Sequence, residues 1–204
     1  MWGAIVEVID SASVTLVGVV LTAVVSILAI IATSRQTART LRQAAARDIL
    51  RVSLEVKQRQ LNELYGPLRS LLDQNRRLAS MLREGKADAD NWRLLDHITE
   101  VVSNPQDKAI VDEIMNIDRK VEDLILNKAG LVRGPRPPES FGLFLGHYKL
   151  LKLKWEGKEN LGVKEYQYYP RSLNEDVDKD YEAIKSEIDK TILKYESVLA
   201  EELK

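Results

Sequence analysis

The sequence predicts an all-α protein made of an N-terminal transmembrane helix, a long amphipathic helix and a cytoplasmic helical bundle. Residues 11–34 are uncharged and mostly apolar, and apolar residues recur every three or four positions over much of the remaining chain. Prolines and glycines gather in a few short segments between these repeats. The predicted boundaries are a short external N-terminus at 1–10, the transmembrane helix at 11–34, a basic juxtamembrane helix at 35–85 and the remaining bundle at 86–204.

The apolar run at 11–34 is predicted to be a retained membrane anchor. An α-helix of this length rises roughly 36 Å, and the hydrocarbon core of a bilayer is about 30 Å thick. A cleaved signal peptide fits less well, because the preceding residues are acidic and no A-x-A exit follows the run. A buried core helix also fits less well, because the rest of the chain is amphipathic and highly charged.

Basic residues are found on one side of this run only. Glu7 and Asp10 are the only charged residues before position 34, whereas five arginines lie between 35 and 51. The positive-inside rule then places the N-terminus outside and the C-terminal part in the cytoplasm. Three of these arginines share a helical face and are predicted to contact lipid headgroups, or else to act only as a topology signal: Arg35, Arg39 and Arg42.

Small residues form a single stripe along the predicted anchor, at spacings of four, three, four, four, three and four. Such a stripe lets two helix backbones approach closely, and its hydroxyl groups can bond across the contact. We therefore expect helix–helix association, either with further copies of the chain or with a partner membrane protein; a lone anchor is the alternative. The stripe consists of Ser11, Thr15, Gly18, Thr22, Ser26, Ala29 and Thr33.

The basic helix at 35–85 has a heptad seam with a polar member at Asn75. Its leucines are predicted to face a partner or the rest of the bundle: Leu61, Leu64, Leu68, Leu71, Leu78 and Leu82. Gly66 and Pro67 interrupt the seam, and a kink is expected there because proline has no backbone N–H to donate.

The second half of the chain is predicted to form further helices. One is expected to begin near Asp90, and another at Pro105 with Asn104 as its N-cap. A Pro-rich loop is expected at 130–142. Residues 139–156 favour a helix, although "LKLKW" could instead pair with "EYQYYP" as a hairpin. The final segment, 172–204, has ten acids and five lysines, which makes it a natural neighbour for the basic helix.

Residues capable of catalysis or metal binding are sparse. There is no cysteine, and the two histidines, His97 and His147, lack the spacing of a metal site. The acids at 176, 178, 180 and 187 imitate a calcium loop, but Tyr181 replaces the required glycine, so a helical reading is favoured. Tyr166, Tyr168 and Tyr169 suggest a base-stacking patch less strongly than core packing. We expect no enzyme, cofactor, metal or nucleic-acid partner.

Two short motifs suggest a relationship. "SRQTAR" follows the predicted anchor, and "LNELYGPLRSLL" lies on the next helix. Over about residues 12–82 the chain resembles small, uncharacterised bacterial single-pass inner-membrane proteins. The resemblance implies a bacterial inner-membrane location and supplies no active site.

These patterns together favour a membrane-tethered interaction or scaffold protein that acts through protein contacts at the cytoplasmic face. The alternative is a membrane effector, which would oligomerise and perturb the bilayer when its cytoplasmic domain is triggered.

Overall fold

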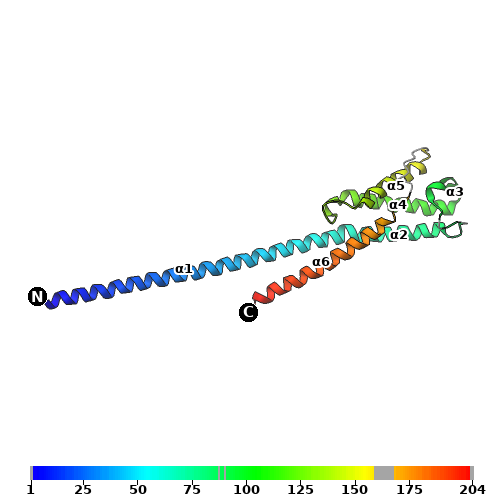
Figure 1. Ribbon diagram of the computed structural model, residues 1–204. Coiled ribbons are helices and arrows are strands. Elements are labelled where there is room, and N and C mark those ends of the chain that lie inside the picture. Colours follow the sequence, from blue (N-terminus) through cyan, green and yellow to red (C-terminus); the bar gives the residue numbers. More distant parts are fainter. Residues whose placement is uncertain (1, 87, 90, 159–167, 203–204) are drawn as a thin grey trace. The chain divides into compact units, whose positions relative to one another are not determined.

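The computed structural model confirms an all-α chain. It describes residues 2–86, 88–89, 91–158 and 168–202, with side chains at all of these except 2–20, 23 and 201–202. Within the described residues there is no β-strand. The longer helices are α1 (Trp2–Arg59), α2 (Gly66–Arg83), α4 (Pro105–Asn127), α5 (Glu139–Trp155) and α6 (Ser172–Glu202), with short helical segments between them (Figure 1).

The chain divides into two compact units. The first unit comprises Met1–Arg51 with Ser197–Lys204, and the second comprises Val52–Glu196. The first unit is formed by most of α1 and the end of α6. All of the buried hydrophobic residues lie in the second unit, so the hydrophobic core of the described chain is there.

The predicted location of the chain in a membrane is wrong. Among the described residues, no helix combines the length and the apolar character that a membrane crossing needs. The structure thus contradicts a single-pass inner-membrane protein with its N-terminus outside and its C-terminal domain in the cytoplasm.

Between α1 and α2 the chain forms one wide π-helical turn, η1 (Gln60–Tyr65). The N–H of Gly66 donates to the carbonyl of Leu61, five residues earlier, and Pro67 follows in the first turn of α2. Because proline has no N–H and its ring crowds the preceding turn, a regular α-helix is disfavoured at this point. A kink was expected at Gly66 and Pro67. The structure has a π turn at Gln60–Tyr65, directly before these two residues.

Of the two helices expected after α2, the first is shorter than predicted and the second begins where it was predicted to begin. The helix expected near Asp90 is reduced to a 3-10 turn, η2 (Leu94–Asp96), and a short helix, α3 (Ile98–Ser103). The expected N-cap of α4 is confirmed, because the Asn104 side chain accepts hydrogen bonds from the backbone N–H groups of Gln106 at 3.0 Å and Asp107 at 3.4 Å.

The helical reading of residues 139–156 is confirmed by α5. The expected Pro-rich loop is shorter than 130–142, because the 3-10 turn η3 (Ala129–Leu131) precedes it and α5 begins immediately after Pro138. The first half of "EYQYYP", the other part of the alternative hairpin, lies outside the described residues, and residues 168–170 are in no strand.

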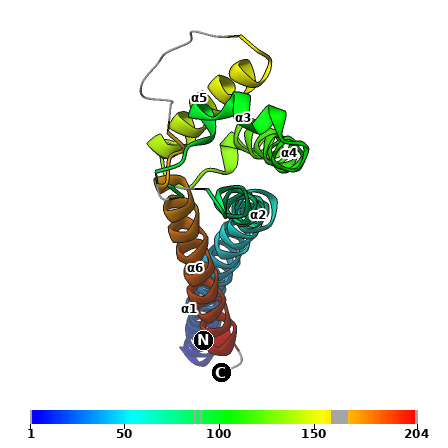
Figure 2. The same ribbon diagram turned by 90° about the vertical axis from the view of Figure 1, so that its right-hand side faces the viewer.

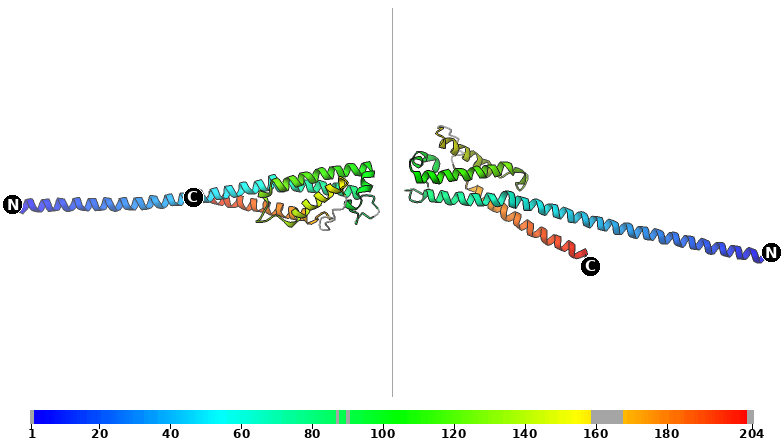
Figure 3. Two further views of the ribbon diagram at one scale, coloured as in Figure 1. Left: turned by 90° about the horizontal axis from the view of Figure 1, so that it is seen from above. Right: turned by 180° about the vertical axis from the view of Figure 1, so that it is seen from behind.

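In the second unit, α4 runs back along α2 (Figures 1 and 3), and Figure 2 shows these two helices side by side and nearly end on. Their facing side chains, together with α5 and the first half of α6, form the main core. Its largest fully buried side chains are Tyr65, Phe141 and Phe144. A smaller cluster around Leu82, Val101 and Val111 closes the end where α2 meets α3.

The expected pairing of the basic helix with the acidic last helix is confirmed within this unit. Arg69 of α2 forms ion pairs with Asp178 at 2.8 Å and Glu182 at 3.1 Å, both on α6. Its guanidinium also lies 4.6 Å from the centre of the Tyr181 ring. Asp178 and Tyr181 are thus part of a helix–helix contact and not of a calcium loop.

Candidate functional site

α1 has large apolar side chains that no other part of the described chain covers. They occupy most of the helix circumference, apart from the side taken by small residues, and each exposes between 42% and 65% of its surface: Leu21, Val24, Val25, Ile27, Leu28, Ile30 and Ile31. Contiguous apolar surface of this kind usually marks an interaction site.

The described part of the small-residue stripe lies on this exposed segment. Thr22, Ser26, Ala29 and Thr33 are all exposed, and the side chains of Ser11, Thr15 and Gly18 lie outside the described residues. The Ser26 hydroxyl donates to the Thr22 carbonyl at 2.8 Å, and the Thr33 hydroxyl donates to the Ala29 carbonyl at 2.9 Å. Both hydroxyl protons are therefore already bonded within α1. A helix that packs against the stripe would meet small side chains whose hydroxyl oxygens can still accept hydrogen bonds.

Arg35, Arg39 and Arg42 follow the apolar segment on α1 and are exposed. Their predicted contact with lipid headgroups is tested by no feature of the structure and stays a prediction.

The leucines of the predicted seam lie against the core of the second unit. Leu64, Leu68 and Leu82 are buried, and Leu61, Leu71 and Leu78 are partly buried against the same clusters. Leu72 is buried more deeply than Leu71. These side chains contact the chain's own helices, so they do not form a free surface for a partner.

A polar cluster ties η1 and the Pro-rich loop to α6. The buried Tyr65 hydroxyl donates to Asp180 at 3.0 Å and accepts the backbone N–H of Arg133 at 2.9 Å. The Arg133 guanidinium bonds Asp180 at 3.2 Å and Glu187 at 2.9 Å. Burial raises the pKa of Tyr65 to about 12, and the bonds to Glu187 and Asp180 raise the pKa of Arg133. The Tyr65 hydroxyl therefore stays protonated and acts as a structural crosslink.

A second polar cluster lines a cavity of about 940 Å³ in the second unit, between α2, α4, α5 and the residues that lead into α6. At its floor, the Asn75 amide donates to Asp118 at 2.5 Å. Asp118 is 1% exposed, and Asn75 is its only hydrogen-bond partner among the described residues. Burial raises the pKa of the Asp118 carboxyl to about 7, although the Asn75 bond partly opposes this shift. Asp118 can thus gain or lose a proton near neutral pH.

Aromatic side chains form further parts of the cavity wall. Tyr169 lies edge-on to His147, with ring centres 5.8 Å apart, and burial raises the pKa of its hydroxyl. Trp92 stacks on His97 with ring centres 5.2 Å apart, and its Nε1–H is buried with no acceptor among the described residues. Tyr168 is exposed, and the Arg93 guanidinium lies over its ring in a cation–π contact, 4.2 Å from the ring centre.

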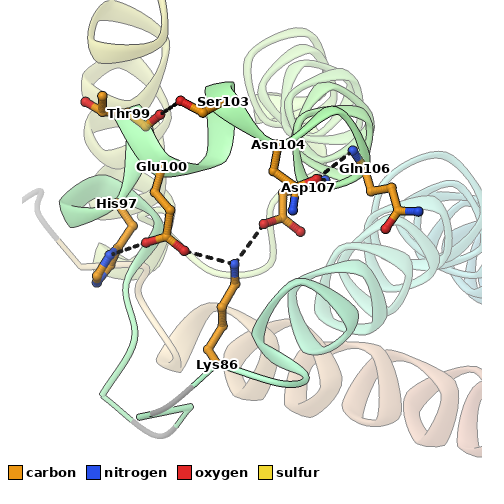
Figure 4. A network of polar contacts seen from close by, with 8 residues as sticks. All are labelled: Lys86, His97, Thr99, Glu100, Ser103, Asn104, Gln106 and Asp107. Carbon is orange, nitrogen blue, oxygen red and sulfur yellow. Dashed lines mark hydrogen bonds and ion pairs between the residues drawn. The ribbon is translucent and has the colours of Figure 1, made fainter.

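A salt-bridge network holds the segment that carries Trp92 (Figure 4). The Lys86 ammonium bonds Asp107 at 2.8 Å and Glu100 at 3.2 Å, and these bonds raise the pKa of Lys86. Glu100 also contacts His97 at 3.1 Å. Because the network joins the turn after α2 to α3 and to the first turn of α4, it restrains the residues on both sides of Trp92.

Sequence reasoning missed this cavity. His147 was expected only not to be a metal ligand, core packing was favoured over base stacking for Tyr168 and Tyr169, and Asn75 was noted only as a polar member of a leucine seam. The missed signal was Asp118, a charged residue at helical spacing among the apolar residues of α4: Ile114, Asp118, Val121 and Ile125. Tyr166, of the same suggested stacking patch, lies outside the described residues.

Among the described residues, no group of acids and histidines is arranged to hold a metal ion. The chain matches no protein-family model, no curated protein and no solved structure. The resemblance based on "SRQTAR" and "LNELYGPLRSLL" therefore stays a prediction.

Proposed function

We propose that this chain is a helical interaction protein that assembles with further copies of itself through α1. The observation that supports the proposal is the exposed apolar segment of α1, residues 21–31. Each large apolar side chain is worth roughly 1.5–3 kcal/mol when it is moved from water into a packed environment. The small-residue stripe occupies one side of the segment and the large apolar side chains occupy the others, so burying the segment requires more than one neighbouring helix.

The arrangement of charges favours antiparallel neighbours. The uncharged run 11–34 has Glu7 and Asp10 before it and Arg35 and Arg39 after it. If two copies of α1 align antiparallel about Thr22, position 35 of one copy falls within two residues of position 10 of the other. Position 39 likewise falls within two residues of position 7. A parallel alignment would instead bring arginines beside arginines, and like charges across a contact are unfavourable.

The stripe of small residues supports close approach in the same alignment. An antiparallel pair centred on Thr22 brings that residue beside its own copy and brings Ser11 beside Thr33. Two identical helices related by a twofold axis form a self-complementary contact of this kind, and the large apolar side chains on the other sides of each helix are then buried by further copies.

Engineered cysteines would test both the association and its direction, because the chain has no native cysteine. With Thr22→Cys, oxidation should link two copies. Ser11→Cys and Thr33→Cys should each link poorly alone and should link efficiently to each other when the two variants are mixed. A monomeric wild type in analytical ultracentrifugation would refute the proposal, as would efficient self-linking of both terminal variants.

Charge reversal offers a matched control. Replacing Glu7 and Asp10 with Lys should weaken association about tenfold, since several opposite-charge pairs per dimer become like-charge pairs. Mixing this variant with one in which Arg35 and Arg39 are replaced by Glu should restore association. Glu55→Lys, on the same helix but beyond the proposed overlap, should have little effect. Loss without restoration would point to a different partner for α1.

A further inference from the structure

We infer that the cavity between α2, α4 and α5 binds a small phosphorylated nucleoside, with the base among the aromatic side chains and the phosphate at the arginines of the rim. The cavity, about 940 Å³, lies within the range of small-molecule sites. It is formed by the second unit alone, so this inference does not depend on the assembly proposed for α1.

The lining of the cavity includes one buried donor that the described residues leave without an acceptor, and one carboxyl that can form further hydrogen bonds. The Asp118 carboxyl receives one hydrogen bond, from Asn75, and has capacity for more. The buried Nε1–H of Trp92 meets no acceptor among the described residues. Buried polar groups are rarely left without partners in a folded protein. A nucleobase has both donors and acceptors on its edges, so it can bond groups of either kind.

The walls favour a flat ligand. Trp92 and Tyr169 line the cavity from different segments of the chain, and each is fixed by ring contacts, with His97 and with His147 respectively. Aromatic faces stack on nucleobases with little dependence on the base, whereas an acid–amide pair such as Asp118 and Asn75 can read the hydrogen-bonding edge.

The rim favours an anion. Arg83, Arg93 and Arg171 line the cavity, and none of them forms an ion pair with a described carboxylate. Arg83 bonds the carbonyl of Ala79 at 3.1 Å through Nε, which leaves its terminal nitrogens available. Two acids, at 175 and 178, also line the cavity, and the second is already paired with α2. Arginine forks bind phosphate oxygens with two parallel hydrogen bonds, so a phosphate fits this rim.

Isothermal titration calorimetry on the full chain, with AMP, GMP, CMP and UMP as separate probes, would test the inference. At least one of them should bind, with a dissociation constant below about 1 mM. The matching nucleoside and ribose 5-phosphate should each bind roughly tenfold more weakly, because each lacks one of the two recognised parts.

Variants distinguish a built site from adventitious anion binding. Arg83→Gln should weaken binding of the preferred nucleotide about tenfold, and Asp118→Asn should do the same or change which base is preferred. Arg77→Gln is the control, since Arg77 is exposed on the same helix, pairs with Asp73 and does not line the cavity. Thermal melting would confirm that each variant is folded. No binding by any of the four nucleotides would overturn the inference, as would equal binding of ribose 5-phosphate or equal effects of Arg83→Gln and Arg77→Gln.

Discussion

Replacing Asp118 with Asn should make the stability of the protein less dependent on pH. The pKa of this carboxyl is raised from 3.8 to about 7 in the folded chain. Between these values the folded state holds a proton that the unfolded state has released, so the free energy of unfolding falls as pH rises through this window. Each pKa unit corresponds to about 1.4 kcal/mol, so ionisation of Asp118 costs at most about 4 kcal/mol by pH 8.

The substitution removes the titrating group and keeps an oxygen at position 118 that can accept the Asn75 hydrogen bond. At pH 5 the variant should be more stable by about 1–2 kcal/mol, because Asp118 is neutral in the folded wild type but already ionised in its unfolded state. At pH 8 the variant should be more stable by about 4 kcal/mol, because the full shift in pKa then counts against the wild type. Urea unfolding followed by circular dichroism at both pH values would measure the difference.

Asp123→Asn is the matched control. Asp123 is exposed on the same helix, α4, and its replacement should shift stability by no more than about 0.5 kcal/mol at either pH. Other titrating groups affect the variant and the wild type alike, so the comparison isolates position 118. An equal stability difference at pH 5 and pH 8 would show that Asp118 is not a buried acid of raised pKa.

Three further substitutions test other parts of the second unit. Gly66→Ala should destabilise the chain by about 1–3 kcal/mol, because a Cβ there would lie 2.8 Å from the backbone oxygen of Leu61. Gly142→Ala is the control, since a Cβ there meets nothing within 4 Å, and it should stabilise the chain by about 0.5–1 kcal/mol in the same urea assay. Asn104→Ala should lower the unfolding free energy by about 1 kcal/mol through loss of the α4 cap, and an unchanged urea midpoint would contradict this. Arg133→Met should speed amide hydrogen exchange in the first half of α6, and unchanged exchange would show that the crosslink does not restrain that helix.

Much of the helical content could be predicted from local patterns. The start of α4 followed from Asn104 and Pro105, since capping and proline placement act over a few neighbouring residues. The contact between α2 and α6 could be predicted because the first segment is net basic and the second is net acidic. The extent of the second helix was overestimated, because the apolar residues near Leu94 pack as a 3-10 turn and a short α-helix.

The remaining features depend on contacts between distant residues. Asp118 and Asn75 are 43 positions apart, and no local pattern shows that an acid on one helix meets an amide on another. The π turn likewise reflects how one helix adapts to Pro67 while it keeps Tyr65 and Leu68 buried. The membrane prediction depended on residues 11–34 as one apolar unit, and among the described residues no helix is long and apolar enough to cross a membrane.

The π turn η1 also bears on how this protein can vary in evolution. Successive residues of an α-helix are rotated by about 100°, so deleting one residue between 60 and 65 would turn all of α2 by that amount relative to the end of α1. Leu68 and Leu72 would leave the core, and Arg69 would no longer face the acids of α6. An insertion or deletion in the loop at 132–138 would rotate no helix. Among natural relatives of this chain, differences in length should therefore collect in that loop, and the spacing from Tyr65 to Leu82 should stay constant.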